Sequence, residues 1–156
     1  MRTEFVLLEF NTTVLLGILA FCALTDILYR RVSETGLGVT ALAMLAVDGT
    51  VFHARWWLLL SLSLCGVSLG ALWWMVDRSH ALGDAEMVGM MGMGLGPLAL
   101  VPVFLALVAA LVSRPFWPVL AGSRVQSEER RLAPLGVYFF LGLAMTVLLF
   151  LAILRP

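Results

Sequence analysis

The sequence predicts an all-α integral membrane protein of about six transmembrane helices, with both termini on the outer side. Hydrophobic residues make up 62% of the 156 residues, whereas a soluble domain is about half apolar. They gather in long runs, and a chain of this length has room for roughly five to seven spans of about 20 residues. We therefore expect residues 1–156 to form a single membrane-embedded domain without a soluble domain.

Charge and cysteine content exclude several classes of function. The ten basic residues balance the ten acidic ones, which argues against a nucleic-acid partner. The two cysteines lie in apolar runs without a Cys-x-x-Cys motif, so we expect neither a redox pair nor a zinc ribbon. No group of His, Cys and carboxylate residues has metal-ligand spacing, and we expect no metal and no cofactor. The N-terminus lacks a clear basic region and cleavage site, so we expect no removed signal peptide.

The first helix is expected within residues 5–29. Glu9 and Asn11 make its beginning polar, so we expect a frayed start and a lipid-crossing part over residues 13–28. Asp26 lies near the end of this helix.

The next two helices are expected over residues 37–52 and 56–76. The second helix is short and holds Asp48 near its outer end; like Glu9, this residue is assigned no catalysis. Gly66 and Gly70 in the third helix predict close packing against another helix. Tryptophans at both ends of the third helix are typical of interfacial aromatic belts: Trp56, Trp57, Trp73 and Trp74.

The fourth helix is expected over residues 83–94, and Gly96-Pro97 makes the outer turn after it. Glycine is unfavourable in a helix interior, so a glycine-rich helix indicates close backbone contact with its neighbours. Its methionines predict adaptable packing. The fifth helix is expected over residues 98–112. A polar loop over 115–132 precedes the sixth, over 134–154, in which Pro134 suits the first turn.

Arginine counts orient these helices. Two arginines directly after the first helix mark its end as cytoplasmic. Counting crossings from there places seven arginines on the cytoplasmic side: Arg30, Arg31, Arg78, Arg114, Arg124, Arg130 and Arg131. Three remain outside: Arg2, Arg55 and Arg155. This excess predicts that both termini lie outside.

The same count brings two carboxylates to one membrane face, because Asp26 ends the first helix and Asp84 begins the fourth. Two facing carboxylates share one proton, so that one acts as general base on a water and the other as general acid on a carbonyl, as in aspartic proteolysis. Gly83 permits a close backbone approach beside Asp84. The alternatives are that Asp84 only caps its helix, or that Asp77 replaces Asp26.

Three segments together resemble the motifs of type IV prepilin peptidases, in family order and over nearly the whole chain. Asp26 with Tyr29-Arg30-Arg31-Val32 resembles the first aspartate motif. Ala81-Leu82-Gly83-Asp84-x-Glu86 resembles Gly-x-Gly-Asp-x-Lys. Ala133-Pro134-Leu135-Gly136 resembles the Pro-Phe-Gly-Pro segment that opens the last helix of that family.

The resemblance implies a multi-pass aspartic endopeptidase of the bacterial inner membrane, so the outer side, on which the arginine count places both termini, is the periplasmic side. Such enzymes remove the short basic leader of prepilin or pseudopilin substrates at the cytoplasmic face. The catalytic residues carried over are Asp26 and Asp84, with Gly83, Pro134 and Gly136 shaping the site. The chain looks like the short, peptidase-only members that serve tight-adherence pili, so N-methyltransferase activity is not expected.

Departures from the family pattern keep other functions open. Ala81 stands in place of the first glycine, Glu86 in place of a common lysine, and Ser33-Glu34 in place of Pro-Asn. One alternative is a small proton-coupled membrane transporter subunit that uses the same carboxylates as a relay. The other is a catalytically inactive scaffold in pilus assembly.

Overall fold

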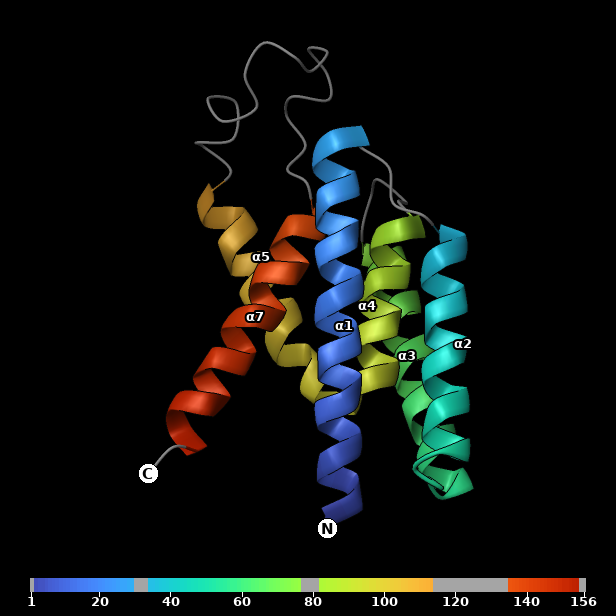
Figure 1. Cartoon of the computed structure of the whole chain (residues 1–156). Helices are drawn as coiled ribbons and strands as arrows, with labels where there is room; N and C mark the ends of the chain where they lie inside the picture. The colour runs from blue at the N-terminus through green and yellow to red at the C-terminus, as the bar shows by residue number, and fades with distance from the viewer. Residues whose placement is uncertain (1, 30–33, 77–81, 114–134, 155–156) are drawn as a thin grey trace.

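The computed structural model describes residues 2–29, 34–76, 82–113 and 135–154, and these residues form helices and one short turn without any strand. Figure 1 shows the helices side by side in a bundle. In chain order they are α1 (Arg2–Tyr29), α2 (Glu34–Thr50), α3 (Trp56–Val76), α4 (Leu82–Leu95), the 3-10 helix η1 (Gly96–Ala99), α5 (Leu100–Ser113) and α7 (Leu135–Leu154).

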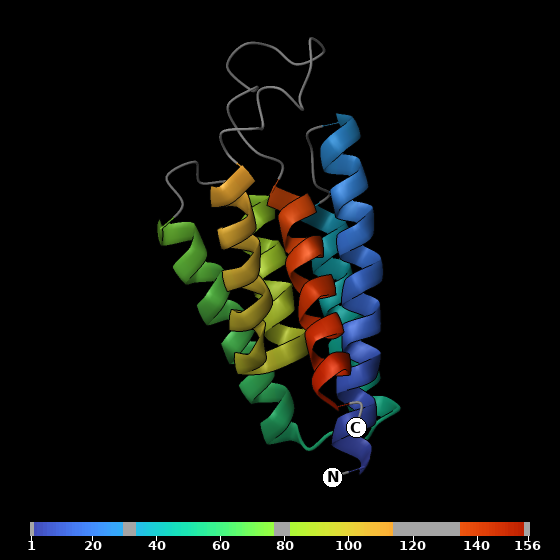
Figure 2. The ribbon, with the colours of Figure 1, turned by 90° about the vertical axis from the view of Figure 1, so that its left-hand side faces the viewer.

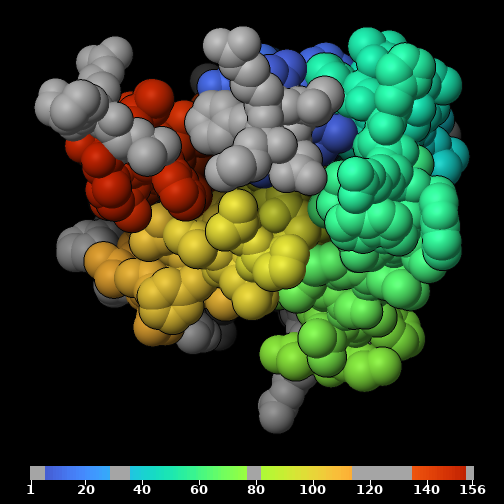
Figure 3. All heavy atoms as spheres, turned by 90° about the horizontal axis from the view of Figure 1, so that it is seen from below, coloured from blue at the N-terminus to red at the C-terminus, as the bar shows by residue number. Residues whose placement is uncertain are grey.

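Successive helices run in opposite directions (Figures 1 and 2). The C-terminal ends of α1, α3 and α5 and the N-terminal ends of α2, α4 and α7 lie together at the upper end of the bundle in Figure 1. Both chain termini lie at the lower end. Seen from below in Figure 3, yellow residues around η1 fill the middle of that end, between α7 and the segment that joins α2 to α3.

Four segments of the described chain are long and apolar enough to cross a membrane: Val6–Leu28, Trp56–Val76, Leu82–Ser113 and Leu135–Ile153. Large apolar side chains, such as Phe104, Leu111 and Ile153, are exposed on the outside of the bundle. Exposed apolar surface on this scale is what a lipid environment favours. The chain is therefore a multi-pass membrane protein.

The longest apolar segment folds back on itself at Gly96. This residue has a φ of +58°, in the left-handed region that glycine adopts without a steric penalty. Pro97 follows at the start of η1, where its fixed φ suits a helical turn. The turn divides the segment into α4 and α5 and confirms the break predicted at Gly96-Pro97.

The backbones of α3 and α4 are in close contact. A Cβ atom added to Gly66 would lie 2.7 Å from the carbonyl oxygen of Gly89, and one added to Gly92 would lie 2.8 Å from the Cα of Gly66. A Cβ on Gly70 would lie 3.0 Å from the carbonyl oxygen of Ala85. A Cβ does not fit at Gly66 or Gly92 without a shift and is tight at Gly70, so the predictions of close packing at Gly66 and Gly70 and along the glycine-rich helix are confirmed.

The core surrounds α4, which contacts α1, α2, α3 and α7. Its methionines Met87, Met90 and Met91 are buried, which confirms their predicted role in packing. They share one core cluster with Leu15 and Leu19 of α1 and with apolar residues of α2, α5 and α7.

One expectation about an individual helix is wrong. The start of α1 is not frayed, because the helix begins at Arg2 and its buried Asn11 is hydrogen-bonded to Asp48 of α2. Trp73, expected in an interfacial belt, packs its ring edge-on against Phe139 of α7, with ring centroids 5.3 Å apart. The prediction for α3, in contrast, matches its observed bounds.

The α3–α4 contact predicts how glycine substitutions affect stability. Gly66→Ala pushes the backbone of α4 away from α3, and overpacking of this kind lowers the free energy of unfolding by about 1–3 kcal/mol. We expect a lower thermal unfolding temperature in detergent micelles. The matched control is Gly17→Ala in α1, where an added Cβ meets nothing within 4 Å. An equal unfolding temperature for Gly66→Ala and Gly17→Ala would contradict the assigned contact.

Candidate active site

The carboxylate of Asp26 lies in the last turn of α1 and accepts a hydrogen bond from the backbone N–H of Gly136, 3.2 Å from Oδ2. Gly136 is the second residue of α7. The first N–H groups of a helix have no partner within it, and the positive end of the helix favours an anionic acceptor. Asp26 thus holds the start of α7 against the end of α1.

The helices α1 and α7 come close together at Gly136. An added Cβ would lie 3.3 Å from Oδ2 of Asp26 and 3.4 Å from the carbonyl oxygen of Cys22. Two residues predicted from motifs 110 positions apart therefore meet in space.

Asp26 continues a buried stripe along α1. Residues three or four apart in a helix share a face, and Asn11, Leu15, Leu19 and Cys22 are buried at such spacings before Asp26. Asp26 itself is half-buried. The apolar part of the stripe is therefore bounded by a polar residue at each end.

Asp84 occupies the corresponding place on α4. It lies in the first helical turn and is half-buried. By helical spacing it shares a face with Met87, Val88 and Met91, which are buried in the same core cluster as Leu15 and Leu19 of α1. Asp84 thus begins the face of α4 that packs into this core.

Gly136 begins the third such stripe. Phe139 and Leu143 follow it on α7 at the same helical spacing and are buried in the core cluster shared by α1 and α4. Asp26, Asp84 and Gly136 thus lie at the upper ends of three stripes that meet in one core (Figure 1).

Aromatic residues of α3 and α7 pack near this end of the core. Trp73 of α3 packs edge-on against Phe139, with an interplanar angle of 70°. Its Nε1 is buried and has no hydrogen-bond partner. Tyr138, which precedes Phe139 on α7, hydrogen-bonds through its hydroxyl to the hydroxyl of Ser113 of α5. Sequence reasoning missed both contacts, because neither residue stands out within its apolar helix.

The predicted site residues thus have different outcomes. Asp26 and Gly136 are in contact, and Gly83 and Asp84 lie at the same end of the bundle in the first turn of α4. Pro134 lies outside the described residues, as do Ala81, Ser33 and Asp77. In the part of the chain that the structure describes, no group of three or more His, Cys, Asp or Glu residues is arranged to hold a metal ion.

A second polar cluster lies towards the other end of the bundle. Nδ2 of Asn11 donates hydrogen bonds to Oδ2 of Asp48 at 3.0 Å and to the carbonyl oxygen of Gly94 at 3.4 Å. Asn11 and Asp48 are 0% and 1% exposed. The sequence places both polar residues towards the same end of their helices, Asn11 near the start of the first and Asp48 near the end of the second. Hydropathy alone does not reveal that they form a hydrogen bond. The cluster ties α1, α2 and α4 together.

Comparison of the chain with models of protein families, with curated proteins and with solved structures found no match.

Loss of the Asn11–Asp48 hydrogen bond should destabilise the protein. Asn11→Leu removes the donor and leaves the Asp48 carboxyl buried without it, which lowers the free energy of unfolding by about 1–3 kcal/mol. The thermal unfolding temperature should fall, whereas Thr13→Leu on the exposed side of α1 should leave it nearly unchanged.

The double variant Asn11→Leu/Asp48→Leu distinguishes a hydrogen bond from simple packing. Replacing both partners by apolar groups removes the unsatisfied carboxyl, so the double variant should be more stable than Asn11→Leu. If the loss of stability in the double variant equals the sum of the losses in Asn11→Leu and Asp48→Leu, the hydrogen bond contributes nothing.

Proposed function

We propose that the protein is a membrane aspartic endopeptidase of the prepilin-peptidase type. It cleaves the N-terminal leader of prepilin-like or pseudopilin substrates at the cytoplasmic membrane face, with Asp26 and Asp84 activating a water. The observation that carries the proposal is that Asp26, Asp84 and Gly136 lie at the same end of three helices whose buried faces share a core, with Gly136 hydrogen-bonded to Asp26. The motif resemblance of the same three positions supports it independently of that arrangement.

The proposed orientation has six spans with both termini on the periplasmic side of a bacterial inner membrane. The helix ends at the upper end of the bundle in Figure 1 are joined by residues 30–33, 77–81 and 114–134, which lie outside the described residues. These three segments contain seven of the ten arginines of the chain. An excess of arginine marks the cytoplasmic side of a membrane, so the upper end with Asp26 and Asp84 faces the cytoplasm.

The chemistry needs one ionised and one protonated carboxyl group. The ionised group removes a proton from a water, whose oxygen attacks the scissile carbonyl carbon, while the protonated group donates its proton to the carbonyl oxygen. The tetrahedral intermediate then collapses: the leaving amine takes up a proton from the carboxyl that removed it from water, while the other carboxylate recovers a proton from a hydroxyl of the intermediate as the C–N bond breaks. The hydrogen bond from Gly136 holds the Asp26 carboxylate in one orientation, which a pair that shares a proton requires.

The transporter alternative receives less support. A proton relay needs polar groups in sequence from one face of the membrane to the other. On α1 the buried residues between Asn11 and Asp26 are Leu15, Leu19, Cys22 and Ala23. On α4 the face below Asp84 is formed by Met87, Val88 and Met91. These apolar stretches separate the two polar clusters.

Loss of either aspartate should abolish cleavage. Asp26→Asn and Asp84→Asn each remove a group that must gain or lose a proton, and general acid–base groups contribute roughly 10²–10⁴-fold to rate. The measurement is the size shift of a co-expressed prepilin on a gel, with the amount of peptidase in the membrane fraction as the control for insertion.

Asp48→Asn is the matched control for this experiment. It makes the same chemical change in a buried carboxyl at the other end of the bundle, so cleavage should persist. Full cleavage by Asp26→Asn or Asp84→Asn would overturn the assignment. An absence of cleavage by the unaltered protein, across several prepilins that a known peptidase cleaves, would favour the inactive scaffold.

Chelation should not affect the reaction. Because two carboxylates activate the water, treatment of detergent-solubilised protein with EDTA should leave the cleavage rate unchanged. A loss of activity that zinc or magnesium restores would contradict the two-aspartate mechanism.

A further inference from the structure

The Asn11–Asp48 pair leaves two buried oxygen atoms without a hydrogen bond. Nδ2 of Asn11 donates to Oδ2 of Asp48 at 3.0 Å and to the carbonyl oxygen of Gly94 at 3.4 Å, which uses both hydrogens of the amide. Oδ1 of Asn11 and Oδ1 of Asp48 are buried, and neither has a hydrogen-bond partner among the described residues. Buried polar atoms are nearly always paired, so these two oxygens require an explanation.

Apolar side chains enclose the pair along the bundle. Leu15 of α1 and Met44 of α2, each one helical turn above the pair, are buried. At the lower end, the rings of Phe10 and Phe52 pack against each other with centroids 5.3 Å apart. The side chains of the pair itself are almost completely buried. The two unpartnered oxygens therefore lie in an apolar enclosure away from bulk water.

No cation is paired with Asp48 in the part of the chain that the structure describes. The hydrogen-bond partner of its carboxyl group is the neutral amide of Asn11. The titratable residues nearest to the pair in sequence, Glu9, His53 and Arg55, are exposed. An ionised carboxylate in an apolar environment is costly when its one partner is neutral. These surroundings favour the uncharged form of Asp48.

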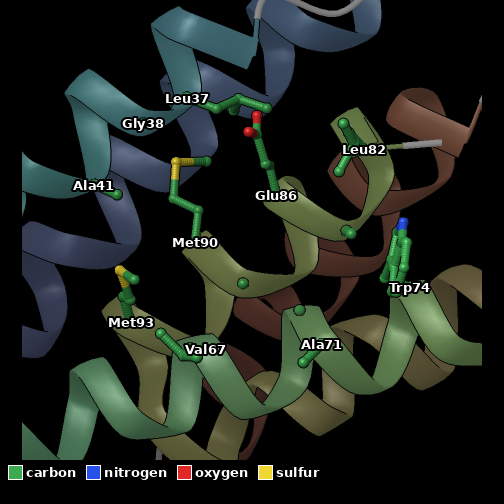
Figure 4. A pocket seen from close by; sticks show the side chains of 14 residues that line it. Leu37, Gly38, Ala41, Val67, Ala71, Trp74, Leu82, Glu86, Met90 and Met93 are labelled. Carbon is green, nitrogen blue, oxygen red and sulfur yellow. The ribbon is translucent and has the colours of Figure 1, made fainter. Parts of the chain in front are cut away.

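The other carboxyl groups of α2 and α4 do not lie beside Asp48. Asp84 is in the first turn of α4, and Figure 4 shows the carboxylate of Glu86 beside Leu37, near the start of α2. Leu37 precedes Asp48 by about three helical turns, or about 16 Å. Residues 87–99, which include Gly94 and η1, contain no titratable residue, and α3 and α7 contain no acidic or basic residue.

We propose that Asp48 carries a proton on Oδ1 and forms a reciprocal acid–amide pair with Asn11. The Oδ1–H group of Asp48 donates to Oδ1 of Asn11, while the amide of Asn11 donates to Oδ2 of Asp48. A single proton thus satisfies both unpartnered oxygens and removes the buried charge. Loss of this proton loosens the link between α1 and α2, because two oxygens without a hydrogen between them then face each other. The inference does not depend on the proposed function.

Infrared spectroscopy of the full chain in lipid nanodiscs tests for the proton, because a protonated carboxyl has a C=O stretching band that a carboxylate lacks. At about pH 7 an ordinary aspartate is ionised. We expect the unaltered protein to show one such band that Asp48→Asn lacks. The matched control is Glu9→Gln, which makes the same chemical change at an exposed carboxyl of α1 and should remove no band. If Asp48→Asn removes no band either, the proposal is overturned, and a water or a cation at the pair would give that result.

A second variant keeps this test decisive if Asp48→Asn fails to fold. Asn11→Leu removes both partners of the carboxyl group and leaves its proton in place. The C=O band should persist and move to higher frequency, since neither end of the carboxyl is then hydrogen-bonded to the amide. An identical carboxyl band in the unaltered protein and in Asn11→Leu would contradict the reciprocal pair.

The dependence of stability on pH gives an independent measurement. The native state holds a proton at Asp48 that the unfolded chain releases above about pH 4, so stability falls as the pH rises. The readout is unfolding in mixed detergent micelles, compared with Asp48→Asn, whose amide donates to Asn11 at every pH. The folding equilibrium constant of the unaltered protein, divided by that of Asp48→Asn, should decrease by up to about tenfold per pH unit. A ratio that stays constant or rises with pH would overturn the proposal.

Discussion

The close contact between α3 and α4 is the constraint on which the rest of the structure depends. Glycine is unfavourable in helix interiors, so α4 gains little from its own backbone and relies on its neighbours. Gly66 of α3 faces Gly89 and Gly92 of α4 so closely that a Cβ on Gly66 or Gly92 would meet backbone atoms of the other helix at less than 3.0 Å. Because lipid is as apolar as a leucine side chain, such van der Waals packing takes the part that burial from water plays in soluble proteins.

The central position of α4 has consequences at both ends of the bundle. At the upper end it places Asp84 at the start of a face that packs against α1 and α7, which carry Asp26 and Gly136. Towards the lower end the carbonyl of Gly94 joins the Asn11–Asp48 pair. In an apolar solvent each polar group needs a partner within the protein. The two polar clusters therefore fix how α1, α2, α4 and α7 are rotated relative to one another.

Much of this fold could be predicted from the sequence, because membrane thickness dictates helix length and turn residues mark the ends. The bounds of α3, the break at Gly96 and the tight glycine contact follow from these rules. The buried face of each helix does not follow, because lipid-facing and core-facing residues are both apolar. Trp73 shows the difficulty, since its position at a helix end is typical of an interfacial residue and yet its ring packs against Phe139. The motif resemblance implied that Asp26 and Gly136 share a site, but only the fold shows the hydrogen bond between them.

The separation of Asp84 from Glu86 follows from helix geometry alone. Residues two apart lie on nearly opposite sides of a helix, so the two carboxylates leave α4 in different directions although neighbouring helices surround it. If both carboxylates lay on one side, their charges would repel each other and the sharing of a proton between Asp26 and Asp84 would be disturbed. The first turn of α4 carries Asp84, and the glycine contact with α3 keeps this helix in place.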